Sequence, residues 1–314
     1  MSTRHNTEKL KTKMEFKSLT HNIEIPVLGL GTWDIGGGMV TDTTYDKESI
    51  HAIKTAIKLG MTHIDTAEMY GHGHAEELVG EAIKDFNRES LFITTKVLPE
   101  NLRYDDVIAS AKKSLRRLKT EYIDLYLIHI PNPKIPIQKT MKALNFLHEQ
   151  GLIKFIGVSN FSVKQMKEAQ KSSQNKIVAN QIEYSLLVRD DGNEYISNME
   201  SKVIPYCQEN DIMVVAYRPL ARGRLTRPGF KILDKLAKKY NKTQAQIAIN
   251  WLISKKKVIT IPKSTSIGHL KENLGAIGWR LKPEDIRIGG QVLQSHNLNF
   301  LYSFYSPVNC NNRP

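Results

Sequence analysis

The chain alternates between short apolar runs and amphipathic helical segments, and this alternation restricts its fold more than any other feature. The apolar runs begin near residues 28, 63, 91, 123, 154, 177, 212 and 258, so successive starts are 23 to 46 residues apart. A parallel strand needs a crossover helix of about that length before the next strand pairs with it. Eight such units predict an α/β fold, the (β/α)8 TIM barrel, whose strands are apolar because both of their faces are buried.

The expected strands are Leu28–Trp33, His63–Ala67, Leu91–Lys96, Ile123–His129, Lys154–Ser159, Ile177–Glu183, Ile212–Tyr217 and Val258–Pro262. Between them, helical spacing indicates buried faces, as at Val107, Ala111 and Leu115. A helix is also expected over Met199–Glu209. Two further short strands, Met14–Leu19 and Ile23–Leu28, flank a Thr-His-Asn turn and predict an N-terminal β-hairpin that closes one end of the barrel.

An open, doubly wound sheet is the alternative to the barrel. That fold carries G-x-G-x-x-G between its first strand and first helix, to bind a dinucleotide phosphate. Here Gly29-Leu30-Gly31-Thr32-Trp33 is followed by Asp34, which places an acid where the phosphate would approach. The barrel is therefore favoured.

The length of 314 residues is compatible with one barrel domain. We expect a disordered N-terminal arm at residues 1–13, which are polar, one barrel domain at 14–295 and a C-terminal tail at 296–314. The aromatic residues of the tail, such as Phe300 and Tyr302, are expected to pack against the barrel, although they could also cover its mouth.

The composition excludes several classes of protein. The formal net charge is +13, but the basic residues are distributed along several helix faces and form no continuous stripe, so nucleic-acid binding is not expected. The two cysteines, Cys207 and Cys310, have no metal-ligand spacing, so no metal site is expected and a reducing cytoplasm is indicated. The N-terminus lacks the apolar stretch of a signal peptide. The sequence also contains no run of 18 apolar residues, so a membrane partner is not expected.

Polar groups follow three successive expected strands at their carboxyl ends. Asp65 lies near the end of the second strand and Tyr70 follows it, and Lys96 and His129 end the third and fourth. In a barrel mouth, Asp65 would keep Lys96 charged, and that cation would lower the pKa of the Tyr70 phenol towards the working pH of a general acid. His129 would orient a substrate oxygen by hydrogen bonding.

Each of these residues also has a purely structural explanation. Asp65 could cap a helix, Lys96 could extend to solvent from a strand end, Tyr70 could lie at the rim, and His129 could be a hydrogen-bonded core histidine. Their joint placement at neighbouring strand ends favours chemistry.

The chain resembles the aldo-keto reductase family over roughly residues 15–285. The matching motifs lie in order along the chain, at the expected strand ends. They are Gly29–Trp33, Asp65–Gly71, Thr94–Val97, Asp124–His129, Ile156–Phe161, Asn180–Tyr184 and Ile261–Ser264.

The resemblance implies an NAD(P)H-dependent oxidoreductase that reduces an aldehyde or ketone, with Asp65, Tyr70, Lys96 and His129 as the catalytic tetrad. It also implies a nicotinamide cofactor, NADPH with NADH possible, extended across the barrel mouth. Ser159, Asn160 and Gln181 match residues that bind its carboxamide, and Tyr217 matches the ring that stacks on the nicotinamide. The other implied cofactor contacts are Gly31, Thr32, Arg218, Leu220, Lys263, Ser264, His269, Glu272 and Asn273.

Two residues depart from the family pattern. Arg218 stands where serine is usual, and His269 stands where arginine is usual. Histidine is mostly neutral at pH 7 and lacks the guanidinium fork, so the preference for NADPH over NADH is expected to be weaker than in relatives with arginine.

Trp33 is the expected substrate wall, with core packing as its alternative explanation. The expected partner is a small carbonyl compound, and the protein is expected to be a monomer. Two other functions stay open: a cofactor-binding regulatory subunit of the same fold, resembling potassium-channel β-subunits, and an unrelated barrel hydrolase that uses Asp and Glu.

Overall fold

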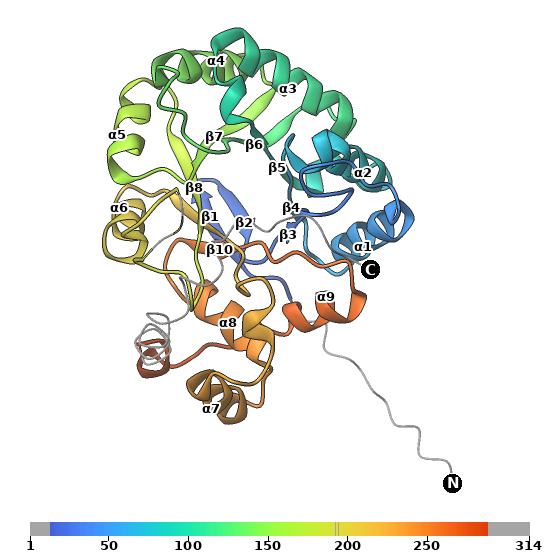
Figure 1. Cartoon of the computed structure of the whole chain (residues 1–314), viewed down its shortest axis with the longest axis vertical. Helices are drawn as coiled ribbons and strands as arrows, with labels where there is room; N and C mark the ends of the chain where they lie inside the picture. Colours follow the sequence, from blue (N-terminus) through green and yellow to red (C-terminus); the bar gives the residue numbers. More distant parts are fainter. Residues whose placement is uncertain (1–12, 192, 194, 288–314) are drawn as a thin grey trace, which may run out of the picture.

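The computed structural model describes residues 13–191, 193 and 195–287 (Figure 1). The expectations for the N-terminal arm, apart from residue 13, and for the tail at 296–314 lie outside these ranges, as does the end of the expected barrel domain.

Eight strands form one parallel sheet in chain order. They are β3 (Leu30–Gly31), β4 (His63–Asp65), β5 (Phe92–Val97), β6 (Ile123–Ile128), β7 (Ile153–Ser159), β8 (Ile177–Glu183), β9 (Met213–Tyr217) and β10 (Val258–Thr260). Parallel bridges between Leu28 and Thr260 and between Gly31 and Lys263 join the first strand to the last. The sheet therefore closes on itself, and the predicted (β/α)8 barrel is confirmed.

Helices surround the strands (Figure 1). The described α-helices are α1 (Asp46–Lys58), α2 (His74–Ile83), α3 (Tyr104–Leu118), α4 (Ile137–Glu149), α5 (Val163–Lys171), α6 (Ile204–Glu209), α7 (Lys231–Tyr240), α8 (Gln244–Ile253) and α9 (Ile267–Leu274). Their apolar faces pack on the outside of the barrel, as for Val107, Ala111 and Leu115 of α3. In the described part of the chain, no helix is both long and apolar enough to cross a membrane.

One expected helix is present in two parts. The helix expected over Met199–Glu209 is a π-helical turn at Met199–Val203 followed by α6. Pro205 lies in the first turn of α6, where its missing N–H costs no hydrogen bond, so the α-helix begins there.

The expected N-terminal hairpin is present as β1 (Phe16–Thr20) and β2 (Ile23–Pro26), which pair antiparallel. Leu19 and Ile25 pack against interior barrel residues such as Leu125 and Val215. Lys17 donates hydrogen bonds of 2.6–2.7 Å to three carbonyls, those of Ile253, Lys255 and Val258. The hairpin thus closes the amino-terminal end of the barrel and leaves the carboxyl end of the strands for a site.

Candidate functional site

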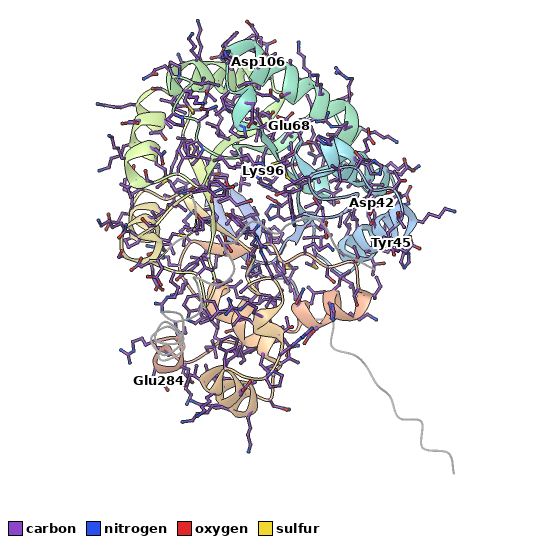
Figure 2. All side chains as sticks on the ribbon, viewed as in Figure 1. Asp42, Tyr45, Glu68, Lys96, Asp106 and Glu284 are labelled. Carbon is purple, nitrogen blue, oxygen red and sulfur yellow. The ribbon has the colours of Figure 1, made fainter. Side chains whose placement is uncertain are left out.

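Four ionisable side chains converge at the carboxyl end of β4, β5 and β6. Asp65 ends β4, Lys96 lies near the end of β5, and His129 follows β6. Tyr70 begins η1, a short 3-10 helix (Tyr70–Gly73) after β4. All four side chains are buried, and Figure 2 shows Lys96 near the centre of the ring of helices, while Asp42, Tyr45 and Asp106 lie at the periphery. We call these four residues the catalytic cluster.

Lys96 connects the members of the cluster. Its Nζ donates to Asp65 Oδ1 at 2.5 Å, to the carbonyl of Thr66 at 2.7 Å and to Tyr70 Oη at 3.3 Å. Gln181 of β8 donates to Asp65 Oδ2 at 2.7 Å, so both carboxylate oxygens have partners. The ammonium group uses all three of its hydrogens, which holds it in one orientation.

The buried charges of Lys96 and Asp65 compensate each other. Burial alone would lower the pKa of Lys96, but the carboxylate of Asp65 and the phenol of Tyr70 raise it above its ordinary value. Lys96 therefore remains an ammonium group at neutral pH. For Asp65, burial raises the pKa, whereas Lys96 and the Gln181 amide oppose that rise.

The sequence-based expectation of a lowered Tyr70 pKa is wrong in direction. Burial raises the pKa of the phenol above its ordinary value, and Asp65 adds to this, although Lys96 opposes both. Tyr70 is consequently protonated at neutral pH. Burial, with a contribution from Lys96, holds the pKa of His129 well below its ordinary range, so its imidazole is neutral. The site therefore holds two neutral groups that can donate hydrogen bonds beside one cation.

Close backbone packing fixes the position of Tyr70. Gly71 has φ +56°, and a Cβ there would lie 2.3 Å from the carbonyl oxygen of Gly36. Its amide donates to the carbonyl of Gly38 at 2.8 Å. The Tyr70 ring meets the edges of two other rings, with centroid distances of 5.0 Å to Trp33 and 5.7 Å to His129. Trp33 is 37% exposed, so it borders the site as an open wall.

The ends of β7, β8 and β9 form the opposite wall. Asn160 has φ +61° and donates to the carbonyl of His129 and to Ser159 Oγ, and its Oδ1 accepts from Tyr217 Oη at 3.1 Å. Within the described chain, the Ser159 hydroxyl has no acceptor and the Gln181 amide oxygen has no donor, although both residues are buried. One free donor and one free acceptor suit a carboxamide, which needs both.

Sequence reasoning missed two residues of this wall. Asn193, in the loop after β8, donates to Tyr217 Oη at 3.1 Å and to Glu183 Oε2 at 3.2 Å. Glu183 also accepts from Arg218 at 3.1 Å. No spacing rule singles out Asn193, because it lies in an irregular loop far from any strand end.

The segment from Lys263 to Asn273, which we call the β10–α9 segment, contains the remaining expected cofactor residues. Lys263 and His269 are exposed, and Glu272 is partly exposed. Ser264 Oγ bonds the backbone of Ser266, whose own hydroxyl caps α9 by accepting from the His269 amide. Asn273 is 2% exposed, and its side chain has no hydrogen-bond partner in the described chain. An amide without a protein partner is available to a polar ligand here.

Gly31, Thr32, Arg218 and Leu220 lie between these regions. Thr32 Oγ1 donates to the carbonyl of Asp65 at 3.0 Å, and Gly31 is pressed against the carbonyl of Ile261. In the described chain, the amides of Arg218 and Leu220 donate to no acceptor. They lie in the loop after the seventh barrel strand, where barrels frequently bind phosphate, so the residues present fit an extended dinucleotide.

The known proteins that this chain is similar to share one family. A sequence model of the aldo/keto reductase family matches residues 27–292. Methylglyoxal reductase YeaE of Escherichia coli (strain K12) is 35% identical over 269 residues, which are 84% of this chain and 90% of that protein.

Solved structures are similar as well. The thermostable aldo-keto reductase Tm1743, solved with the inhibitor epalrestat, is 45% identical with a TM-score of 0.84, covering 89% of this chain and 100% of that chain. An aldo-keto reductase from Klebsiella pneumoniae in complex with NADPH is 33% identical with a TM-score of 0.76, covering 85% of this chain and 90% of that one.

Proposed function

Because the chain belongs to the aldo/keto reductase family and is an NADPH-dependent oxidoreductase that reduces carbonyl groups, we propose that Tyr70 is its general acid and that Asp65, Lys96 and His129 support it. The observation that carries this assignment is the contact of Lys96 with both Asp65 and Tyr70 in a buried cluster. The physiological carbonyl compound is proposed to be a small aldehyde or ketone, with 2-oxoaldehydes the first to test because a relative reduces methylglyoxal.

The protein's own groups handle the proton and the charge of the substrate oxygen. The neutral His129 imidazole donates a hydrogen bond that orients the carbonyl oxygen, and protonated Tyr70 transfers its proton to that oxygen as negative charge develops on it. Lys96 stabilises the phenolate that remains, since its ammonium group lies 3.3 Å from Tyr70 Oη. Asp65 keeps Lys96 charged. When bound, NADPH supplies the hydride.

The cofactor contacts divide among three parts of the mouth. Ser159, Asn160 and Gln181 would bind the carboxamide, and Tyr217 would stack on the nicotinamide ring. The amides of Arg218 and Leu220, with Gly31 and Thr32 across the mouth, would border the pyrophosphate. The residues proposed for the adenosine end are Lys263, Ser264, His269, Glu272 and Asn273.

The test is a fluorescence titration with NADPH and NADH, followed by a carbonyl panel that includes methylglyoxal and is monitored by loss of NADPH absorbance. We expect saturable binding of NADPH and turnover of several aldehydes. Binding without turnover across the panel would favour a regulatory subunit. Failure to bind either cofactor would remove the basis for the whole site.

We also propose that residues 14–295 form the reductase domain and that the protein acts as a monomer in the cytoplasm. The monomer proposal is supported by a catalytic cluster whose residues, Asp65, Tyr70, Lys96 and His129, all come from one chain. Light scattering coupled to gel filtration tests it. A reducing compartment is supported by a chain with only two cysteines, of which Cys207 is buried and unpaired.

A further inference from the structure

The Arg218 side chain places a positive charge at the carboxyl end of the barrel, near the catalytic cluster. It follows directly after Tyr217 at the end of β9 and has φ +51°, a left-handed conformation that turns the chain there. Its guanidinium carbon lies 5.6 Å from the centroid of the Tyr217 ring. The charge is also close enough to Tyr70 to lower the pKa of that phenol, against the larger effect of burial. The charged end of the Arg218 side chain therefore acts on Tyr70, whereas its backbone amide, which has no acceptor in the described chain, is part of the loop.

Most of the hydrogen-bonding capacity of this side chain is unused. In the described chain, Arg218 makes one side-chain hydrogen bond, from Nη1 to Glu183 Oε2 at 3.1 Å, although a guanidinium group has five N–H donors. The Arg218 side chain is 34% exposed, and such a partly solvated ion pair contributes little stability. Glu183 keeps a second donor, Asn193, when the arginine turns away. Arg218 can therefore redirect its fork to a ligand without leaving Glu183 unpaired.

The basic residues of the catalytic cluster itself offer no free charge to an anionic ligand. All three hydrogens of Lys96 are used internally, and His129 is neutral. On the opposite side, Trp33 and the ring of Tyr70 offer an apolar surface. A carbonyl compound with an apolar body and one carboxylate matches this arrangement.

We propose that Arg218 is a specificity-determining residue that binds the carboxylate of an acidic carbonyl substrate, so the enzyme favours aldehydes or ketones that carry a carboxylate over neutral analogues of the same shape. A planar guanidinium group suits this role because it can bind both carboxylate oxygens. The inference rests on the proposed function and adds a substrate class to it.

The test compares 4-carboxybenzaldehyde with its neutral methyl ester, methyl 4-formylbenzoate. In Arg218→Met we expect kcat/KM for the acid to fall about tenfold or more, mainly through KM, as one lost charge-assisted contact predicts. The ester should change less than about threefold. Arg218→Lys should recover part of the loss, because it restores the charge without the fork. Arg222→Met is the matched control. It removes an exposed arginine from the same loop and should leave kcat/KM unchanged for both substrates.

A binding measurement separates substrate from cofactor. Calorimetric titration of benzoate into the NADP+ complex should show affinity weakened about tenfold by Arg218→Met, whereas the Kd of NADP+ should change less than about threefold. Glu183→Gln should raise the preference for the acid, because it removes the competing carboxylate; this variant tests the idea even if Arg218→Met is poorly folded.

Three results would overturn the inference. Equal losses for acid and ester, or a NADP+ affinity weakened tenfold, would assign Arg218 to the cofactor. Wild-type reduction of the ester without reduction of the acid would exclude an acid site. If wild type reduces neither compound nor any other carbonyl, the proposed function itself fails.

Discussion

The catalytic cluster and the β10–α9 segment differ in how far their polar groups are paired before any ligand arrives. In the cluster, Lys96 and Asp65 have all their charged atoms in hydrogen bonds and are almost fully buried. In the β10–α9 segment, Lys263 and His269 are exposed, and the Asn273 side chain has no partner in the described chain.

This difference matches two physical tasks. A group that transfers a proton must be held in place before the reaction, because moving it into position would add to the activation free energy of the reaction. Groups that recognise a large flexible ligand can wait in solvent, since each contributes a modest and separable amount of affinity. Changes in the cluster should therefore have large and coupled effects, and changes in the β10–α9 segment small and independent ones.

The largest effect is expected from Tyr70→Phe. The ring keeps its contacts with Trp33 and His129, but no transferable proton remains, so turnover should fall about 10²–10⁴-fold while NADP+ affinity is unchanged. Single-turnover kinetics measure the loss. Tyr126→Phe is the matched control, because the Tyr126 hydroxyl is buried without a hydrogen-bond partner. A Tyr70 variant that retained more than about a tenth of wild-type turnover would not have lost the acid.

Lys96→Met should come next, with losses in both stability and activity. It leaves the Asp65 carboxylate buried without its cation, which costs about 3–5 kcal/mol of unfolding free energy. Adding Asp65→Asn should recover part of that loss, which denaturant unfolding of the single and double variants measures. Equal stability of both variants would mean that the two charges are not coupled.

The same change should alter the pH profile. Lys96 opposes the upward shift of the Tyr70 pKa, so its removal raises that pKa further. Reduction requires protonated Tyr70, and the high-pH decline in kcat should therefore move to higher pH in Lys96→Met, or in the double variant if the single one does not fold. A decline at the wild-type pH would separate Lys96 from Tyr70.

Asp65→Asn should have a weaker effect on turnover than either change above, below the roughly 10²-fold minimum expected for loss of the acid. The asparagine oxygen can still accept from Lys96 or Gln181, but burial then lowers the pKa of an uncompensated Lys96. Activity should consequently be lost first at high pH, where Lys96 deprotonates. Steady-state kinetics across pH 6–9 test this, and a loss as large as that of Tyr70→Phe would contradict it.

His269→Arg should produce the smallest change. A guanidinium group at this exposed position can bind a 2′-phosphate, and we expect the NADPH-over-NADH ratio of kcat/KM to rise about tenfold. The fold should be unaffected, because Ser266 caps α9 through the backbone amide of residue 269. His269→Gln should stay near wild type. An unchanged ratio in the arginine variant would show that the side chain at position 269 does not contact the 2′-phosphate.

The sequence alone determined the barrel and the strand ends that carry the cluster. The repeat of apolar runs follows from local rules, since each strand needs two buried faces and a crossover helix. Asp65, Lys96 and His129 could be placed because the carboxyl ends of parallel strands meet at one edge. The hairpin followed from its turn and its two short flanking runs.

Only the tertiary structure decided how these groups affect one another. The direction of the Tyr70 pKa shift depends on the depth of burial relative to the strength of one nearby cation, and spacing along the chain measures neither. Gln181 and Asp65 are 116 residues apart, yet their hydrogen bond completes the pairing of the carboxylate. Asn193 and Arg218 converge on Glu183 from two different loops. Local sequence specifies which elements form, whereas desolvation and long-range contacts arise only when the closed barrel brings distant strand ends together.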